Sequence, residues 1–410
     1  MERYVGILGI IAILGIAYLL SNNKKNIDIR LIIWGLGLQI FFGIFILVTP
    51  FGKPIFKWCD QAINKLLSFS QDGSKFLFAS FIDGQMHPAV INFAFYVLPT
   101  VIFFSALMSV LYHLGIMQKV IKGIAWIMQR TMKTSGPETT SISANIFVGQ
   151  TEAPLVIKPF ISKMTNSELM AVMTGGFATV AGGVMAIYVG MLQNVPGIAG
   201  HLMAASIMSA PAALVIAKII YPESKEKIDS STIDLTSNLN EPVEGNVLES
   251  LGNGATEGLK LAANIAAMLI AFVALVSLTN YILSIFGTSL EVILGYIFMP
   301  LAFFMGAPWS EANILGSLLG QKIVLTELIA YMNLSAIEIG TPNGISEKTA
   351  ILASYALCGF ANFASIGIQL GGIGSIAPER KKDLAKLVTK AMFGGALASW
   401  LTATIAGILI

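Results

Sequence analysis

The chain has 410 residues, of which 55% are hydrophobic and 12% are charged, and its mean hydropathy is +0.76. Soluble domains carry about 25% charged residues, so this composition excludes an ordinary soluble protein and indicates an integral membrane protein. The net charge of +2 gives nucleic-acid binding no electrostatic support. Cys59 and Cys358 fit no disulfide framework and the three histidines are dispersed, so we expect no zinc or haem site.

Eight segments are apolar enough and long enough to cross a bilayer, which takes about 20 residues per helix. They comprise residues 4–20, 31–49, 88–113, 166–191, 200–220, 259–286, 346–371 and 386–409. Only Arg3 precedes the first segment as a basic residue, and no small-residue cleavage site follows it, which predicts a retained helix. Residues 52–80 and 116–133 are amphipathic and basic, which predicts helices lying in the membrane interface.

Two further apolar regions, residues 137–163 and 306–335, are interrupted by Gly, Pro and polar residues. Each holds one carboxylate at membrane depth, Glu152 in the first and Glu327 in the second. An acidic side chain there costs about 2.5 kcal/mol or more, so it is rarely present without a function. Because irregular backbone at this depth must be buried in protein or line an aqueous cavity, each region predicts a re-entrant hairpin.

The two hairpins begin two matching halves of the chain. Each hairpin precedes two spans, and the first of these spans contains a small, polar patch, at residues 178–183 in one half and 359–365 in the other. Three full crossings separate the hairpins, so the second hairpin must enter from the opposite face. The pattern predicts an inverted repeat with a solute site near the membrane midplane, as in secondary transporters.

These elements predict five parts of the chain. They are an N-terminal scaffold with interfacial helices (1–135), a first transport repeat (136–221), a cytoplasmic linker (222–258), a scaffold helix (259–305) and a second transport repeat (306–410). The linker is polar and rich in Ser and Asn. Residues 289–305 either extend the scaffold helix or form a short helix of their own.

Lys and Arg predict the orientation, because short cytoplasmic loops are enriched in them. Residues 21–30, 116–133 and 378–390 are basic, whereas residues 192–199 and the C-terminus have no basic side chain. Both termini are therefore expected outside the cytoplasm, in a multi-pass protein of the cell membrane. Residues 51–80 give the contrary signal, since this basic stretch would then be external.

The polar patches supply hydrogen-bonding groups for a solute. Gln150, Thr151 and Glu152 offer an amide, a hydroxyl and a carboxylate. Glu327 offers a second carboxylate, and two carboxylates suit a ligand with several hydroxyl donors, such as a sugar. We therefore expect both hairpin tips to face one solute.

The second broken helix adds further polar and aromatic groups. Asn362 and Ser365 lie three residues apart, share one helix face and could complete a cradle for ribose. Phe360 and Phe363 could cover an aromatic base. Taken alone, Asn362 and Ser365 could instead be polar residues of an interhelical contact.

A sodium site requires hard oxygen ligands. Asn145 and Thr179 supply side-chain oxygens, and the backbone carbonyls of Val148 and Val180 become available if the chain unwinds there. Thr179 could also simply bond to its own helix.

Other functions remain open at this point. Both membrane-depth carboxylates could be structural, neutralised by protonation or by a nearby Lys. A proton-coupled transporter of another small polar solute would use one of them as the proton carrier, and a channel is possible in principle. An intramembrane enzyme lacks a nucleophile–base set, since no His lies in any of the four patches.

Four ordered motifs resemble the concentrative nucleoside transporter family. They are GQTEAPLVIKPF at 149–160, GFATVAGGVMAIY at 176–188, GQKIVLTELIAY at 320–331 and CGFANFASIGIQLGGI at 358–373, and the resemblance spans residues 88–409. It implies an all-α homotrimer without a cofactor, in which each protomer has a scaffold and a transport domain that moves like an elevator. It also implies a nucleoside importer coupled to sodium, with protons as the alternative because some bacterial members use them.

The resemblance implies roles for individual residues. Gln150, Thr151 and Val184 would face the nucleobase; Glu152, Glu327, Asn362 and Ser365 would hold ribose; Phe360 would line the site; Asn145, Val148, Thr179 and Val180 would bind sodium. Thr179 stands where Ser is usual and keeps the hydroxyl. Thr326 departs from the family's Asn, which puts the preference for purine or pyrimidine in doubt.

Overall fold

The structure is a computed structural model, and it describes residues 2–50, 52, 54–65, 67, 98–223, 245–341 and 344–410. In this part of the chain every regular element is a helix, and a single β-bridge joins Ile339 to Ile345. Four helical spans are long and apolar enough to cross a membrane, or six if each of two bent pairs counts as one span. Two shorter apolar helices, within 5–19 and 274–284, lie inside expected crossings, and a third, 363–376, overlaps the end of the expected crossing 346–371. The chain is therefore the all-helical, multi-pass membrane protein that its composition predicts.

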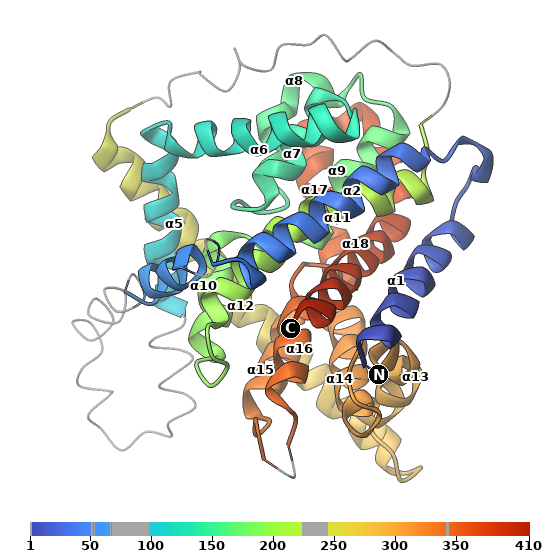
Figure 1. The fold of residues 1–410 in the computed structure, drawn as a ribbon. Coiled ribbons are helices and arrows are strands. Elements are labelled where there is room, and N and C mark those ends of the chain that lie inside the picture. The colour runs from blue at the N-terminus through green and yellow to red at the C-terminus, as the bar shows by residue number, and fades with distance from the viewer. Residues whose placement is uncertain are drawn as a thin grey trace, which may run out of the picture.

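The N-terminal elements surround the two repeats. They are α1 (Glu2–Leu19), α2 (Ile29–Gly43) with its π-helical extension to Val48, α5 (Leu98–His113) and α6 (Ile116–Met132). A bend of 78° separates α5 from α6, and Gly115 lies in it with a φ of 72°. Figure 1 shows α6 lying across one end of the molecule while α5 runs along it, as expected of an interfacial helix. The other expected interfacial segment, 52–80, is helical over 54–65, and most of its remainder lies outside the described residues.

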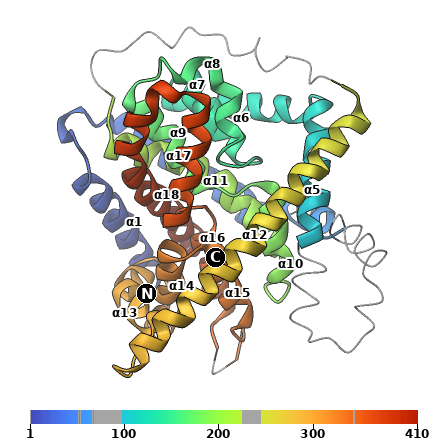
Figure 2. The same ribbon diagram turned by 180° about the vertical axis from the view of Figure 1, so that it is seen from behind.

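The two repeats have the same order of elements. The first contains α7 (Gly136–Asn145), a 3-10 helix (Ala153–Ile157), α8 (Lys158–Ile161), α9 (Asn166–Ala178), α10 (Gly182–Met191) and α11 (Ile198–Ile220). The second contains α14 (Trp309–Val324), α15 (Glu327–Ala336), α16 (Glu347–Leu357), α17 (Phe363–Ile376) and α18 (Lys381–Leu409). Hairpin 1 (136–161) and hairpin 2 (309–336) lie at opposite ends of the molecule (Figures 1 and 2), as an inverted repeat requires.

The region between the repeats contains more helix than the sequence predicts. α12 (Val247–Ser284) begins at residue 247 rather than 259, so residues 247–258 of the expected linker are helical. Asn246 caps the helix by accepting a hydrogen bond of 2.9 Å from the Glu249 amide. Gly254 and Gly258 let this polar stretch approach the backbone of α5, since a Cβ at either would lie 2.7 Å from a backbone atom of that helix. α13 (Leu290–Phe304) is a helix of its own, turned by 118° from α14.

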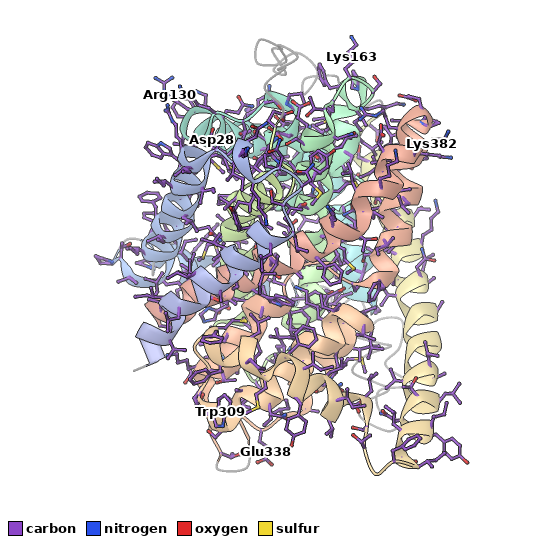
Figure 3. All side chains as sticks on the ribbon, turned by 90° about the vertical axis from the view of Figure 1, so that its right-hand side faces the viewer. Asp28, Arg130, Lys163, Trp309, Glu338 and Lys382 are labelled. Carbon is purple, nitrogen blue, oxygen red and sulfur yellow. The ribbon has the colours of Figure 1, made fainter. Side chains whose placement is uncertain are left out.

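Charged side chains distinguish the two ends of the molecule. Arg130, Lys163 and Lys382 lie at the end formed by hairpin 1, and Glu338 lies at the other (Figure 3). The N-terminus lies near the end formed by α13 and α14 (Figure 1). The basic segments 116–133 and 378–390 thus lie at the same end of the molecule as hairpin 1.

Candidate substrate and cation site

Two broken helices meet inside the molecule. α9 ends at Ala178 and its chain resumes as α10, whereas α16 ends at Leu357 and resumes as α17. Gly359 lies in the second break with a φ of 117°, and a Cβ there would come within 2.7 Å of the Phe177 carbonyl oxygen. Only glycine fits this backbone and this approach. The two breaks are therefore in direct contact, as a midplane site between repeats requires.

Hairpin 1 lies against the first break. The Gly182 amide donates a hydrogen bond of 2.9 Å to the Phe147 carbonyl, which brings residues 145–148 beside residues 179–182. Val148 is half-buried and Val180 is buried. The four residues that sequence analysis assigned to sodium thus come from two chain segments that are in contact.

Asn145 lacks the partners that a buried amide normally has. Its side chain is 1% exposed, and neither its Oδ1 nor its Nδ2 has a hydrogen-bond partner among the described residues. Buried polar groups are almost always paired. The Thr179 hydroxyl donates to the Gly175 carbonyl at 3.0 Å, which leaves its oxygen free to accept a cation. Asn145 and Thr179 therefore provide the hard oxygen donors that suit sodium.

Glu327 lies at the tip of hairpin 2, and two side chains orient its carboxylate. Tyr188 of α10 donates a hydrogen bond of 2.9 Å to Oε1, and Asn362 Nδ2 donates one of 2.6 Å to Oε2. The Asn362 Oδ1 accepts from the Ser365 amide at 2.8 Å and so caps α17. Glu327 is 5% exposed, and each of its oxygens keeps a lone pair for a ligand donor.

One face of α17 also receives the tip of hairpin 1. Gln369 Nε2 donates to the Gln150 Oε1 at 3.0 Å and to the Met173 carbonyl at 3.0 Å. The Thr151 methyl group lies so close to Gly372 that a Cβ there would be 2.4 Å from it. Asn362 and Gln369 are seven residues apart, about 10 Å along a helix. The tip of hairpin 2 thus contacts the start of α17 at Asn362, and the tip of hairpin 1 contacts the same helix about two turns further on, at Gln369.

Glu152 stands outside this network. Its side chain is exposed, and its Oε2 folds back over Gly149, where a Cβ would lie 2.0 Å away. Within the described parts of the chain no hydrogen bond joins Glu152 to Glu327. Tyr112 of α5 lies close enough to Glu152 to interact with it electrostatically. The Tyr112 hydroxyl is buried and has no hydrogen-bond partner among the described residues. That both carboxylates face one solute stays a prediction.

The remaining predicted residues line the breaks. Val184 lies in the first turn of α10 and is 6% exposed, and Phe360 is half-buried in the second break. Phe363 begins α17 and is exposed. Val184 is therefore about as buried as Glu327, whereas Phe360 and Phe363 are more exposed.

Sequence reasoning missed three polar residues: Tyr188, Gln369 and Lys322. Each lies inside one of the quoted motifs, and each is a polar side chain in an apolar helix, which is the signal that could have found them. Tyr188 is held in place by Tyr331, whose ring stacks on it with centroids 4.2 Å apart. Tyr331 is fixed in turn by a 2.7 Å hydrogen bond from its hydroxyl to the Ser354 carbonyl.

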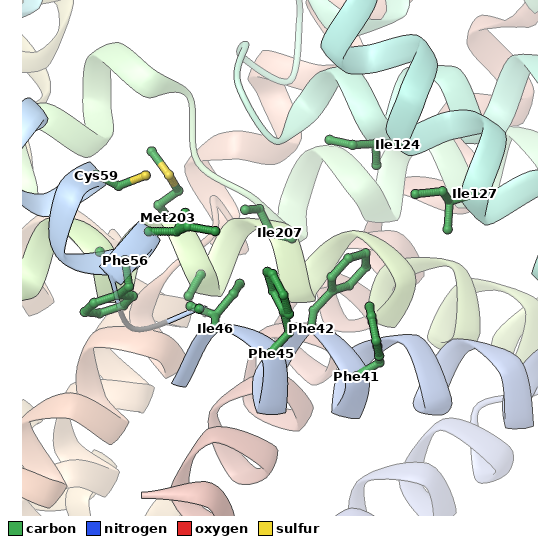
Figure 4. A pocket seen from close by; sticks show the side chains of 14 residues that line it. Phe41, Phe42, Phe45, Ile46, Phe56, Cys59, Ile124, Ile127, Met203 and Ile207 are labelled. Carbon is green, nitrogen blue, oxygen red and sulfur yellow. The ribbon is translucent and has the colours of Figure 1, made fainter. Parts of the chain in front are cut away.

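A separate apolar cavity of 320 Å³ lies between α2, the helix at 54–65, α6 and α11 (Figure 4). Its lining includes Phe41, Phe42, Phe56 and Ile207, and none of its lining residues carries a charge. A sugar requires partners for its hydroxyl groups. This cavity is therefore not the solute site.

Three family profiles match consecutive parts of the chain. They are described as "Na+ dependent nucleoside transporter N-terminus" at residues 8–81, "Nucleoside recognition" at 94–195 and "Na+ dependent nucleoside transporter C-terminus" at 201–407. The chain is 45% identical to an uncharacterized transporter of Bacillus subtilis, over 99% of both chains. It is 40% identical to the sodium/nucleoside cotransporter 2 of Rattus norvegicus, over 100% of this chain and 63% of that protein.

Solved structures give the same relationship. The chain is similar to the transporter CNTnw in an inward-facing substrate-bound state, with a TM-score of 0.91, 40% identity and coverage of 100% of this chain and 98% of the other. A variant of CNTnw in an outward-facing state gives a TM-score of 0.88 at 38% identity, with the same coverage. With its two hairpins, its broken helices and these matches along its whole length, the chain belongs to the concentrative nucleoside transporter family.

Proposed function

We propose that this protein imports nucleosides and draws energy from the sodium gradient by symport, with elevator-type alternating access. The observation that carries the proposal is the shared face of α17, where Asn362 binds Glu327 and Gln369 binds Gln150. Both hairpin tips are thereby directed toward one region. A solute with hydroxyl groups at one end and a planar base at the other matches the chemistry of the residues around it.

The solute would contact residues of both repeats. Oriented carboxylate and amide groups accept from and donate to sugar hydroxyls, so we assign ribose to Glu152, Glu327, Asn362 and Ser365. We assign the nucleobase to Gln150, Thr151 and Val184, with Phe360 covering the site. The orientation of Glu327 by Tyr188 and Asn362 supports the first assignment, because a fixed acceptor discriminates best among hydroxyl positions.

Sodium would bind between hairpin 1 and the first break, to Asn145, Val148, Thr179 and Val180. The unpaired amide of Asn145 supports this site. A cation there ties residues 145–148 to residues 179–182 and so positions Gln150–Glu152 for the solute. Reciprocity then requires nucleoside to raise the affinity for sodium by the same factor.

The proposal also covers the moving parts of the protomer and the trimer. The two repeats, 136–221 and 306–410, would move together against a scaffold of the remaining helices, and three protomers would associate through scaffold surfaces. Exposed apolar side chains on α12 support such a contact: Leu275, Leu278, Tyr281 and Ile282. We assign the basic end of the molecule to the cytoplasm, which places the N-terminus outside. Native mass spectrometry measures the number of protomers, and a monomer would contradict the trimer.

Uptake of labelled uridine into proteoliposomes tests the function, with sodium and proton gradients varied separately. We expect an inward sodium gradient to drive accumulation and a proton gradient alone to have no effect. Asn145→Ala should raise the sodium concentration for half-maximal uptake at least about tenfold. Ser143→Ala is the matched control, because among the described residues that hydroxyl on the same helix bonds only to its own helix and to Met128. Uptake that follows protons and ignores sodium would contradict sodium coupling.

A further inference from the structure

A buried cation lies in hairpin 2 that the proposed function does not use. Lys322 is fully buried, and it is the only Lys or Arg in the sequence between Lys260 and Lys348. A charge at such depth is costly unless it is paired or fully hydrogen-bonded. The contacts of Lys322 therefore require an explanation.

Three oxygen atoms surround the Lys322 ammonium group. Its Nζ donates to the Ala356 carbonyl at 2.8 Å, to the Cys358 carbonyl at 3.3 Å and to the Ser399 hydroxyl at 2.7 Å. An ammonium group has three donors, so all are used. A neutral amine would leave one acceptor without a proton. The site is thus built for a cation with hard oxygen ligands.

The position of these oxygens is informative. Ala356 lies in the last turn of α16, and Cys358 begins the break before α17. The last carbonyls of a helix have no partner within it and carry its negative partial charge. Lys322, which lies in α14 of hairpin 2, therefore supplies hydrogen bonds to the free carbonyl groups at the C-terminal end of α16.

The first repeat has the same architecture without such a cation. Lys322 lies five residues before Glu327, and the residue five positions before Glu152 is Phe147. The sequence has no Lys or Arg at 134–157 or 164–217. Instead, the buried amide of Asn145 has no hydrogen-bond partner among the described residues, and it lies two residues before Phe147, whose carbonyl accepts from the Gly182 amide at the first break. No Lys or Arg of these two ranges can therefore supply a cation to this break.

We propose that the Lys322 ammonium group is the built-in cation of the second repeat. It joins hairpin 2 to the break between α16 and α17, in the place that sodium takes between hairpin 1 and the break between α9 and α10. The comparison with sodium rests on the proposed function. Two consequences follow. Hairpin 2 holds Glu327 in place whether or not sodium is present, and sodium orders only hairpin 1. Lys322 is thus a positioning residue.

Hydrogen–deuterium exchange of the purified full-length protein tests the proposal. In the wild type we expect sodium, added in exchange for choline, to slow exchange in residues 145–152 and 179–182, and to leave residues 322–331 unchanged. Lys322→Ala should speed exchange of residues 322–331 and 356–362 at least about tenfold and weaken uridine binding by a similar factor. The control is Lys260→Ala, since that side chain is 65% exposed.

Rescue by a small amine separates this role from simple packing. Lys322→Ala leaves room for methylammonium among the three oxygens, so millimolar methylammonium should restore slow exchange and uridine binding. Lys322→Met fills the space without a charge and should not be rescued. Equal behaviour of the two variants, with no effect of methylammonium, would overturn the proposal, as would sodium protection of hairpin 2 in the wild type.

Two further results keep the inference separate from the proposed function. A wild type in which sodium protects neither hairpin would contradict sodium coupling, whereas rescue of Lys322→Ala by methylammonium would still support the cation role of Lys322. If Lys322→Ala does not fold, Ser399→Ala tests the same site, because it removes one acceptor and keeps the ammonium group. We expect it to speed exchange in residues 356–362 about threefold to tenfold, and unchanged exchange would contradict the proposal.

Discussion

The Tyr188 hydroxyl donates a hydrogen bond of 2.9 Å to the Glu327 Oε1, so a side chain of the first repeat orients the carboxylate of the second. The two residues lie 139 positions apart in the chain. Both are buried, and Tyr188 is also stacked on Tyr331 of the hairpin that carries Glu327. The link makes the orientation of the Glu327 carboxylate, to which we assign ribose, depend on how α10 packs against hairpin 2.

Loss of this link should weaken nucleoside binding. Tyr188→Phe keeps the stacked ring but removes the donor to Glu327, and a hydrogen bond to a charged group contributes about 1.5–3 kcal/mol. We expect uridine affinity to fall about tenfold or more in isothermal titration calorimetry. Tyr281→Phe is the control, since Tyr281 is exposed on α12. Unchanged affinity in Tyr188→Phe would exclude Tyr188 as an orienting residue.

Glu327→Gln tests whether this carboxylate recognises ribose. The substitution removes one acceptor and gives Asn362 an amide to face, so uridine affinity should fall about 100-fold, as for a buried charged partner that is lost. The preference for uridine over 2′-deoxyuridine and 3′-deoxyuridine should disappear. Competition binding measures both effects, with Glu338→Gln at the opposite end from hairpin 1 as the control. A variant that still discriminates between these hydroxyl groups would contradict the assignment.

The contact of hairpin 1 with α17 provides a matched pair of glycine substitutions. A Cβ at Gly372 would lie 2.4 Å from the Thr151 methyl group, whereas a Cβ at Gly371 would have no atom within 4 Å. Gly372→Ala should therefore displace Thr151 and its neighbour Gln150, and weaken uridine binding at least about tenfold. Gly371→Ala should bind as the wild type does. Equal affinities in the two variants would show that Thr151 need not lie against α17.

A buried ion pair fixes the base of hairpin 1. Lys218 of α11 lies 2.8 Å from Glu138 of α7, and its Nζ also donates to the Ser167 hydroxyl at 3.0 Å. Removal of one partner leaves a buried charge without compensation and costs about 3–5 kcal/mol. Lys218→Met should thus lower the thermal midpoint Tm clearly, as measured by tryptophan fluorescence in detergent.

Two comparisons make the stability experiment specific. Lys260→Met removes an exposed ion pair with Glu257 and should change the free energy of unfolding by less than about 1 kcal/mol. Adding Glu138→Gln to Lys218→Met should recover much of the lost stability, because the buried unpaired charge is gone and Glu223, the other carboxylate beside Lys218, is 27% exposed. A double variant as unstable as the single one would show that packing, rather than the ion pair, holds this base.

Thr326 has a structural role that bears on the choice of base. Its hydroxyl accepts from the Ile329 amide at 3.4 Å and so caps α15 directly before Glu327. Thr326→Ala should lower stability by about 1 kcal/mol, whereas Thr326→Asn should keep the cap. Because the Asn amide extends further beside Glu327, we expect the ratio of uridine to adenosine affinity to change in Thr326→Asn. An unchanged ratio would exclude Thr326 from base selection.

Much of the architecture could be predicted from the sequence, because hydropathy and polar interruptions are local properties. Apolar runs of about 20 residues indicate spans, and Glu152 and Glu327 in interrupted segments indicate two re-entrant hairpins. Residues 247–258 have the polar composition of a linker, yet they are helical. There the contact of Gly254 and Gly258 with α5 supports a helix, and no local pattern reports such a contact.

The sequence by itself determined that this chain crosses the membrane, and it predicts two related halves that each carry one carboxylate in an interrupted apolar segment. Only the tertiary structure decided which groups meet: Gln369 with Gln150 across 219 positions, and Lys322 with the end of α16. The reason is physical. Hydropathy depends on each residue and its near neighbours, whereas a hydrogen bond of about 3 Å between distant segments depends on how all the helices between them pack.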